Sequence, residues 1–265
     1  MLDLGSTALL LVLLLGAAGA GYFVRSRLPE KHRSQESLIL VQLTINLLVT
    51  FTAIVLGLLT TSVKAGFDSA YNARGTYAAE LAQLDEYLRQ YGPETDKIRE
   101  QVRECVAAVI ASTWPDEKPP AGVRYPDVSH MPLVGESDVL GAIINAVGRE
   151  INLLEPKGLG RQRLQAQCAQ EFADVVKARW TVIEGVRESI STPFYWVLVL
   201  WLVILFASLG LTAPANPVTI LVIALSAISL TVAVFVIIDL DLPYGGLFSI
   251  PSTSMRNALA DMMRS

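Results

Sequence analysis

The sequence has 265 residues, of which 52% are hydrophobic and 17% are charged, and its formal net charge is -4. A negative chain with so few charges offers no broad basic surface for nucleic acid, so that class of partner is excluded. Charges are nearly absent from four long apolar stretches, which predicts an integral membrane protein.

Each apolar stretch is long enough to cross a bilayer as a helix, since about 30 Å of hydrocarbon takes roughly 20 residues. The predicted spans are residues 6–24, 38–63, 194–211 and 218–238. A cleaved signal peptide is the rival interpretation of the first stretch, but the basic residues follow the apolar run instead of preceding it. We therefore expect an all-α, multi-pass protein of a bacterial inner (plasma) membrane.

Basic residues crowd the short link between the first two spans. Arg25, Arg27, Lys31 and Arg33 lie there, and short loops rich in Lys and Arg stay on the cytoplasmic side. The link is therefore predicted to be cytoplasmic, with residues 64–192 and both termini on the extracytoplasmic side.

The same pattern divides the chain into four parts. They are residues 1–63 with the first two spans and the basic cytoplasmic link, 64–192 as an extramembrane helical domain, 193–240 with the last two spans, and 241–265 as an amphipathic tail. The apolar residues of the tail, Met255, Leu259 and Met262, suit either the membrane interface or a partner helix.

The extramembrane domain is predicted to be a helical bundle. It begins with a continuation of span two as far as Tyr91, followed by a break at Gly92-Pro93. Further helices are expected over residues 94–112, 138–154 and 161–191, with a proline-rich irregular loop at 115–132. Cys105 and Cys168 both lie in this domain, where one disulfide or two buried thiols fit equally well.

Span two carries polar and small residues that gather on one side. At 100° per residue they fall within an arc of roughly 80°. This polar stripe consists of Gln42, Asn46, Thr50, Ala53, Gly57, Thr60 and Lys64. An unpartnered amide is costly in hydrocarbon, so the stripe is predicted to face away from lipid.

Two interpretations of the stripe stay open. In the first, Ala53 and Gly57 let a neighbouring helix approach closely while Gln42 and Asn46 hydrogen-bond across the contact. In the second, several copies of the chain place the stripe around a water-filled pathway, where amides and hydroxyls replace part of an ion's hydration. Lys64 at one mouth would then favour anions.

Other candidate sites are weaker. The sequence has no motif typical of an enzyme, and its two histidines lack a second ligand at metal spacing, so we expect no catalytic site, no metal and no cofactor. The adjacent acidic pairs Asp85-Glu86 and Asp116-Glu117 are interpreted as solvated charges. Asp239 and Asp241 lie where span four leaves the bilayer, either as an interfacial stop signal or as charges at the mouth of a pathway.

Several segments resemble the DUF4239 family of bestrophin-like bacterial membrane proteins. They are the link RSRLPEKHR, the span-two exit LGLLTTSVKAGFDSAYNARG, LDEYLRQYGPE, STWP and DLDLPYGG. The resemblance implies a relationship to bestrophin anion channels. It also implies a cytosolic helical portion, opposite to the orientation that the basic link predicts, and here we follow the charge rule.

Together these observations predict a homo-oligomeric membrane protein that conducts an inorganic ion passively along span two. The alternative is a non-conducting, membrane-anchored sensor or scaffold whose extracytoplasmic helical domain binds a partner. The expected partners are the lipid bilayer, further copies of the chain and the ion.

Overall fold

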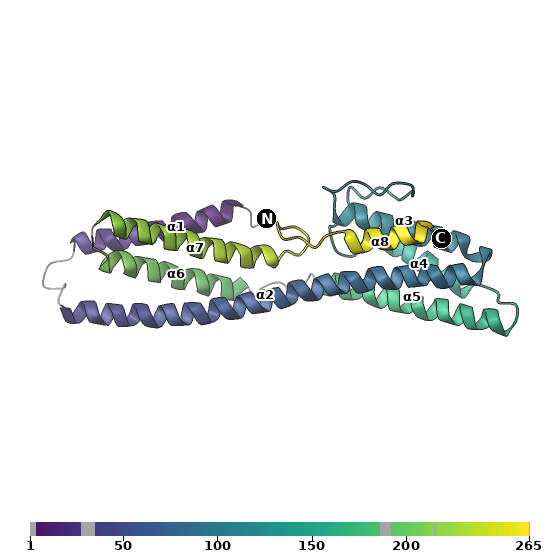
Figure 1. Ribbon diagram of the computed structural model, residues 1–265, viewed down its shortest axis with the longest axis horizontal. Coiled ribbons are helices and arrows are strands. Elements are labelled where there is room, and N and C mark those ends of the chain that lie inside the picture. The colour runs from purple at the N-terminus through teal and green to yellow at the C-terminus, as the bar shows by residue number, and fades with distance from the viewer. Residues whose placement is uncertain (1–3, 28–34, 186–191, 215, 265) are drawn as a thin grey trace. The chain divides into compact units, whose positions relative to one another are not determined.

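The computed structural model describes residues 4–27, 35–185, 192–214 and 216–264 (Figure 1). Every regular element in these ranges is a helix. The elements are α1 (Leu4–Arg27), α2 (Gln35–Tyr91), the 3-10 turn η2 (Pro93–Thr95), α3 (Asp96–Thr113), α4 (Asp138–Asn152), α5 (Leu159–Gly185), α6 (Thr192–Thr212), α7 (Pro217–Leu240) and α8 (Thr253–Arg264). Four helices are long and apolar enough to cross a membrane, over Gly5–Arg27, Ile39–Tyr91, Phe194–Thr212 and Pro217–Leu240. The predicted all-α class with four spans is confirmed.

The chain forms two compact units, each with its own core. The membrane unit comprises residues 1–65 and 189–241, and the helical unit comprises residues 66–188 and 242–265. Helix α2 supplies residues to both because it continues without a break from Gln35 to Tyr91. In the sequence, residues 241–265 stand apart as a tail, whereas in the structure α8 packs on α3 within the helical unit.

In the membrane unit, α1 and α6 pack closely because each helix has a glycine that faces the backbone of the other helix. A Cβ atom on Gly21 would lie 2.0 Å from the carbonyl oxygen of Ala207, and one on Gly210 would lie 1.9 Å from that of Ala18. Small residues of this kind let membrane helices approach closely. Leucine side chains and Phe206, which is fully buried, fill the space beside this contact.

Arg25 fixes the end of the same helix pair. Its guanidinium donates hydrogen bonds to the carbonyl oxygens of Thr212, at 3.3 Å, and of Ala213. These carbonyls have no partner within their own helix, and a basic side chain at a helix C-terminus satisfies them. Of the other basic residues of the link, Lys31 and Arg33 lie outside the described residues.

In the helical unit, the predicted apolar spacing on α2 is confirmed. Leu81, Leu84 and Leu88 are each at most 1% exposed and pack into one core with residues of α3, α4, α5 and α8. The apolar residues of α8, including Met255 and Met262, enter this core. The tail helix therefore takes the second of the two predicted positions, on a partner helix.

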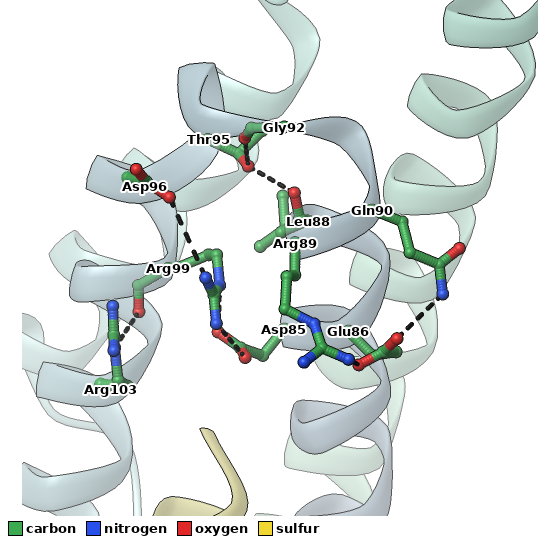
Figure 2. A network of polar contacts seen from close by, with 10 residues as sticks. All are labelled: Asp85, Glu86, Leu88, Arg89, Gln90, Gly92, Thr95, Asp96, Arg99 and Arg103. Atoms are coloured by element: carbon green, nitrogen blue, oxygen red, sulfur yellow. Dashed lines mark hydrogen bonds and ion pairs between the residues drawn. The ribbon is translucent and has the colours of Figure 1, made fainter. Parts of the chain in front are cut away.

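The break between α2 and α3 occurs where the sequence predicts it (Figure 2). Gly92 has φ 127°, a left-handed conformation that favours glycine. The Thr95 hydroxyl lies against the carbonyl oxygens of Leu88 and, at 2.8 Å, Gly92. Pro93 begins the 3-10 turn that follows. The chain therefore reverses direction while the carbonyl oxygens of Leu88 and Gly92 keep a hydrogen-bond partner.

One interpretation of the acidic residues is wrong: Asp85 is not a solvated charge. Its carboxylate accepts two hydrogen bonds from Arg99, from Nε at 3.0 Å and from an Nη at 2.9 Å (Figure 2). The two side chains are only 4% and 8% exposed. Asp85 lies beside Leu84 and Leu88, and a buried carboxylate there requires the cation that α3 supplies.

The remaining helix boundaries differ by a few residues from the predicted ones. Helix α5 is described as far as Gly185, so the predicted continuation through residues 186–191 lies outside the described residues. Between Trp114 and Ser137 the chain is irregular, as the prolines predict. Cys105 and Cys168 are both free and buried, which is the second of the two predicted alternatives.

Candidate ion pathway along helix α2

The polar stripe lies on a face of α2 that its own unit leaves uncovered. All seven of its residues are exposed in the single chain. The face that packs is a different one, and it carries the buried residues Ile45, Thr52 and Val63. Within the described ranges, no helix therefore covers the stripe.

The packing face is roughly 130° away from the middle of the stripe, at 100° per residue. Val55, Leu56 and Leu59 contact the core of the membrane unit from this direction. Phe51 lies at the edge of the packed region, with its ring centroid 6.2 Å from that of Trp201 on α6. These contacts place one side of α2 against the core of the membrane unit.

The polar groups of the stripe differ in how they are hydrogen-bonded. The Thr50 hydroxyl donates to the carbonyl oxygen of Asn46 at 2.9 Å, and the Thr60 hydroxyl donates to that of Leu56 at 2.7 Å. In contrast, the amides of Gln42 and Asn46 have no partner among the described residues. Each amide therefore presents both donors and acceptors to whatever faces the stripe.

Gly57 and Lys64 lie further along the same face. Apart from the adjacent turns of α2 itself, no atom of the described residues lies within 4 Å of the position where a Cβ of Gly57 would be. Lys64 is exposed, and it interacts with a neighbouring group of its own chain.

Asp239 and Asp241 lie at the end of α7. Asp239 is 7% exposed, and Asp241 is half-buried and caps the helix through its backbone N–H. Both take part in interactions within the chain. Their proposed role as mouth charges stays a prediction.

Next to the stripe, α2 carries an exposed apolar face that the sequence did not single out. It consists of Leu43, Leu47, Ile54 and Leu58, which are 54% to 67% exposed. This face is roughly 90° from the middle of the stripe and is on the opposite side from the packed one. Leucine and isoleucine there fit either lipid or a second protein surface.

Thr52 also departs from the expected pattern, because it is a polar residue outside the stripe. It is 5% exposed on the packed face, and its hydroxyl oxygen has no hydrogen-bond partner among the described residues. Thr231 of α7 shares both properties. A buried, unpartnered hydroxyl is destabilising, and we have no physical account of why these two are retained.

Four helices that are long and apolar enough to cross a membrane define the class of protein from the described residues, an α-helical integral membrane protein. A family model described as the Bestrophin-like domain matches residues 12–255, so the chain belongs to the bestrophin-like family. The resemblance noted from the sequence is thereby confirmed as bestrophin-like, and the DUF4239 label is compatible with it.

Solved structures with the same fold include bacterial bestrophin homologues from Klebsiella pneumoniae that carry single mutations. One has a TM-score of 0.69 at 14% sequence identity, covering 97% of each chain. A second has a TM-score of 0.68 at 16% identity, covering 97% of this chain and 98% of the other. A third has a TM-score of 0.68 at 16% identity, covering 98% and 97%. No curated protein matches the sequence significantly.

Proposed function

We propose that the protein is a passive ion channel and not an enzyme, assembled from several copies of the chain around the polar stripe of α2. The observation that carries the proposal is the exposure of Gln42 and Asn46, whose amides lie unpartnered within a predicted membrane span. In lipid these amides would be costly, whereas along a watery path they are solvated.

The three faces of α2 support this arrangement. One face packs on its own membrane unit, the stripe is bare and polar, and the apolar face with Leu43 and Leu58 is bare as well. A helix that lines a closed ring needs three such faces, one for its own subunit, one for its neighbour and one for the pore. Closed symmetry is the usual form of a homo-oligomer.

The chemistry of the stripe suits an inorganic ion. Amides and hydroxyls replace part of a hydration shell without binding the ion so tightly that it stays. In this proposal Lys64 sets a positive potential at one mouth and favours anions, and Asp239 and Asp241 act as further mouth charges. The resemblance to bestrophin anion channels points to the same ion class.

The test is to reconstitute the protein and to compare the conductance of the wild type with Asn46→Leu and Lys64→Glu. We expect Asn46→Leu to lower the conductance at least about threefold, because an apolar ring dewets a narrow pore. Lys64→Glu is expected to shift the reversal potential towards cations. Absence of current in the wild type, or unchanged selectivity in Lys64→Glu, removes the support for this pathway.

A matched pair of threonines sharpens the test. Thr50 belongs to the stripe, whereas Thr52 is buried on the packed face. Thr50→Val is expected to reduce conductance and Thr52→Val to leave it unchanged. The opposite order would show that the path lies on another side of α2.

Oligomeric state in mild detergent separates the channel from the scaffold. A closed ring of three or more copies supports the pore. A monomer, or a dimer in which the stripe is sealed against its counterpart, favours the membrane-anchored scaffold.

A further inference from the structure

The helical unit contains a small cavity of about 40 Å³ with two buried arginines in its wall. Arg74 comes from α2 and Arg179 from α5, and α3 contributes the hydroxyl residues Ser112 and Thr113. All of these residues belong to the helical unit, whereas the polar stripe belongs to the membrane unit. The cavity therefore shares no residue with the polar stripe.

Arg74 is 2% exposed and has no carboxylate partner among the described residues. Its Nε donates to the Tyr244 hydroxyl at 3.1 Å, and its Cζ lies 4.8 Å from the Tyr244 ring centroid and 5.2 Å from that of Trp114. Neither terminal nitrogen has a hydrogen-bond acceptor in the described part of the chain. The aromatic rings offset part of the cost of burying this charge, but they leave four N–H donors unused.

Arg179 provides the second positive charge. Its side chain is 9% exposed, and one Nη donates to the Glu136 carboxylate at 3.3 Å. The Glu136 side chain is 42% exposed, so solvent weakens its charge. Among the described residues, Glu136 is the only carboxylate that pairs with either guanidinium group, and it pairs with Arg179 alone.

Tyr77 also lines the cavity, but it does not supply the missing negative charge, because burial raises the pKa of its phenol far above the usual value. The Cys105 thiol interacts with Tyr77, and burial raises its pKa to about 12. Both groups are neutral at physiological pH. The cluster of Arg74, Arg179, Glu136, Tyr77 and Cys105 has a net charge of one positive unit.

We propose that this cavity binds one small monovalent inorganic anion, of the size of chloride, held by the guanidinium groups of Arg74 and Arg179. Charge-assisted hydrogen bonds to an anion use the terminal N–H groups of Arg74 and neutralise the buried charge. A cavity of about 40 Å³ has room for a small inorganic ion.

The first test is thermal unfolding of the full-length protein in detergent, with chloride replaced stepwise by gluconate at constant sodium concentration. An ion bound only by the folded state raises Tm in a saturable way, here by about 3–6 °C. We expect Arg74→Gln to lose this response. Arg89→Gln, which changes an exposed arginine of the same helix, is the matched control and retains it.

The Asn46→Leu variant tests whether the chloride-dependent rise in Tm arises in the membrane unit instead. Under the proposal Asn46→Leu keeps the chloride-dependent rise in Tm, whether or not it loses conductance, so the two proposals fail separately. The proposed anion site is overturned if the Tm of the wild type does not change with chloride concentration. It is also overturned if Arg74→Gln shows the same chloride-dependent rise in Tm as the wild type.

The second test requires no variant and covers the case in which Arg74→Gln does not fold. Crystals of the wild-type protein grown in bromide are measured at the bromine absorption edge. We expect an anomalous difference peak within hydrogen-bonding distance of both Arg74 and Arg179. Density for water alone, or a cavity without a peak, contradicts the proposal.

Discussion

Glu171 is a carboxyl group that the helical unit buries at some cost. It is 7% exposed on α5, accepts a hydrogen bond from Gln83 at 3.1 Å through one oxygen, and has no partner among the described residues for the other. Desolvation by burial, followed by the neighbouring carboxyl group of Glu80, raises its pKa to about 7. The carboxyl group is therefore partly protonated at neutral pH.

This pKa predicts that the helical unit loses stability as pH rises. Between an unfolded pKa of about 4.5 and the folded value of about 7, the folded state binds more protons, so the stabilisation is complete at low pH and disappears above pH 7. Glu171→Gln is expected to flatten this dependence and to add about 1–2 kcal/mol at pH 8. Thermal unfolding between pH 5 and pH 8 measures the effect.

The exposed Glu100 of α3 offers the control, because Glu100→Gln is expected to preserve the wild-type slope of stability against pH. If Glu171→Gln keeps that slope as well, Glu171 ionises normally and its burial has been misjudged.

The buried pair of Asp85 and Arg99 joins α2 to α3 through two hydrogen bonds. Asp85→Ala leaves a buried guanidinium without its anion, which typically costs about 3–5 kcal/mol. The adjacent Glu86 pairs with Arg89 in a half-exposed position, so Glu86→Ala is expected to cost less than about 1 kcal/mol. Denaturant unfolding of both variants gives the comparison, and equal losses would refute the distinction.

At the residue scale, the sequence predicts which side chains are apolar or polar but not which distant ones meet. The sequence predicts a solvated Asp85, because its partner Arg99 belongs to the following helix, beyond the reach of helical periodicity. The cavity with Arg74 and Arg179 was missed for the same reason, since 105 positions separate the two arginines in the chain. Tertiary packing alone brings such residues together.

At the scale of elements, the contact between α1 and α6 depends on two glycines. Gly21→Leu places a side chain where the backbone of α6 lies, since even a Cβ would be 2.0 Å from a carbonyl oxygen. We expect a loss of more than about 3 kcal/mol, seen as a lower Tm in detergent. Gly16→Leu is the control on the same helix, because nothing lies within 4 Å of its Cβ position. Similar Tm values for both variants would argue against close packing.

Most elements follow from local patterns. The apolar run of span two, the leucine spacing after it and Gly92-Pro93 together predict one long helix that ends at Tyr91, and α2 ends there. The place of α8 could not be predicted, because an amphipathic helix fits a membrane interface as well as a protein core. The contact of α8 with α3 depends on tertiary packing, in which Met255 and Met262 fill the core of the helical unit.

At the scale of the whole molecule, the polar stripe was predicted as a pattern, but its surroundings could not be. One chain leaves the stripe exposed, so what faces Gln42 and Asn46 is decided by assembly. The orientation in the membrane also stays a prediction, and it rests on the basic link. Arg25 adds a packing role to that link, since it caps the end of α6.

The two native cysteines make a direct test of the pathway practical. Both are buried, and desolvation raises the pKa of the Cys168 thiol to about 11 and that of Cys105 to about 12. Thiols that stay protonated react slowly with water-soluble reagents. The reaction of a cysteine introduced into α2 is therefore measured with little contribution from the two native cysteines.

The decisive measurement is the reaction of a charged, water-soluble thiol reagent with Asn46→Cys in the reconstituted protein, recorded together with the current. Ile45→Cys, on the packed face, and Leu58→Cys, on the exposed apolar face, are the matched controls. We expect Asn46→Cys to react fastest and its modification to change the current. An Asn46→Cys that reacts no faster than Ile45→Cys would contradict a water-filled path along the stripe.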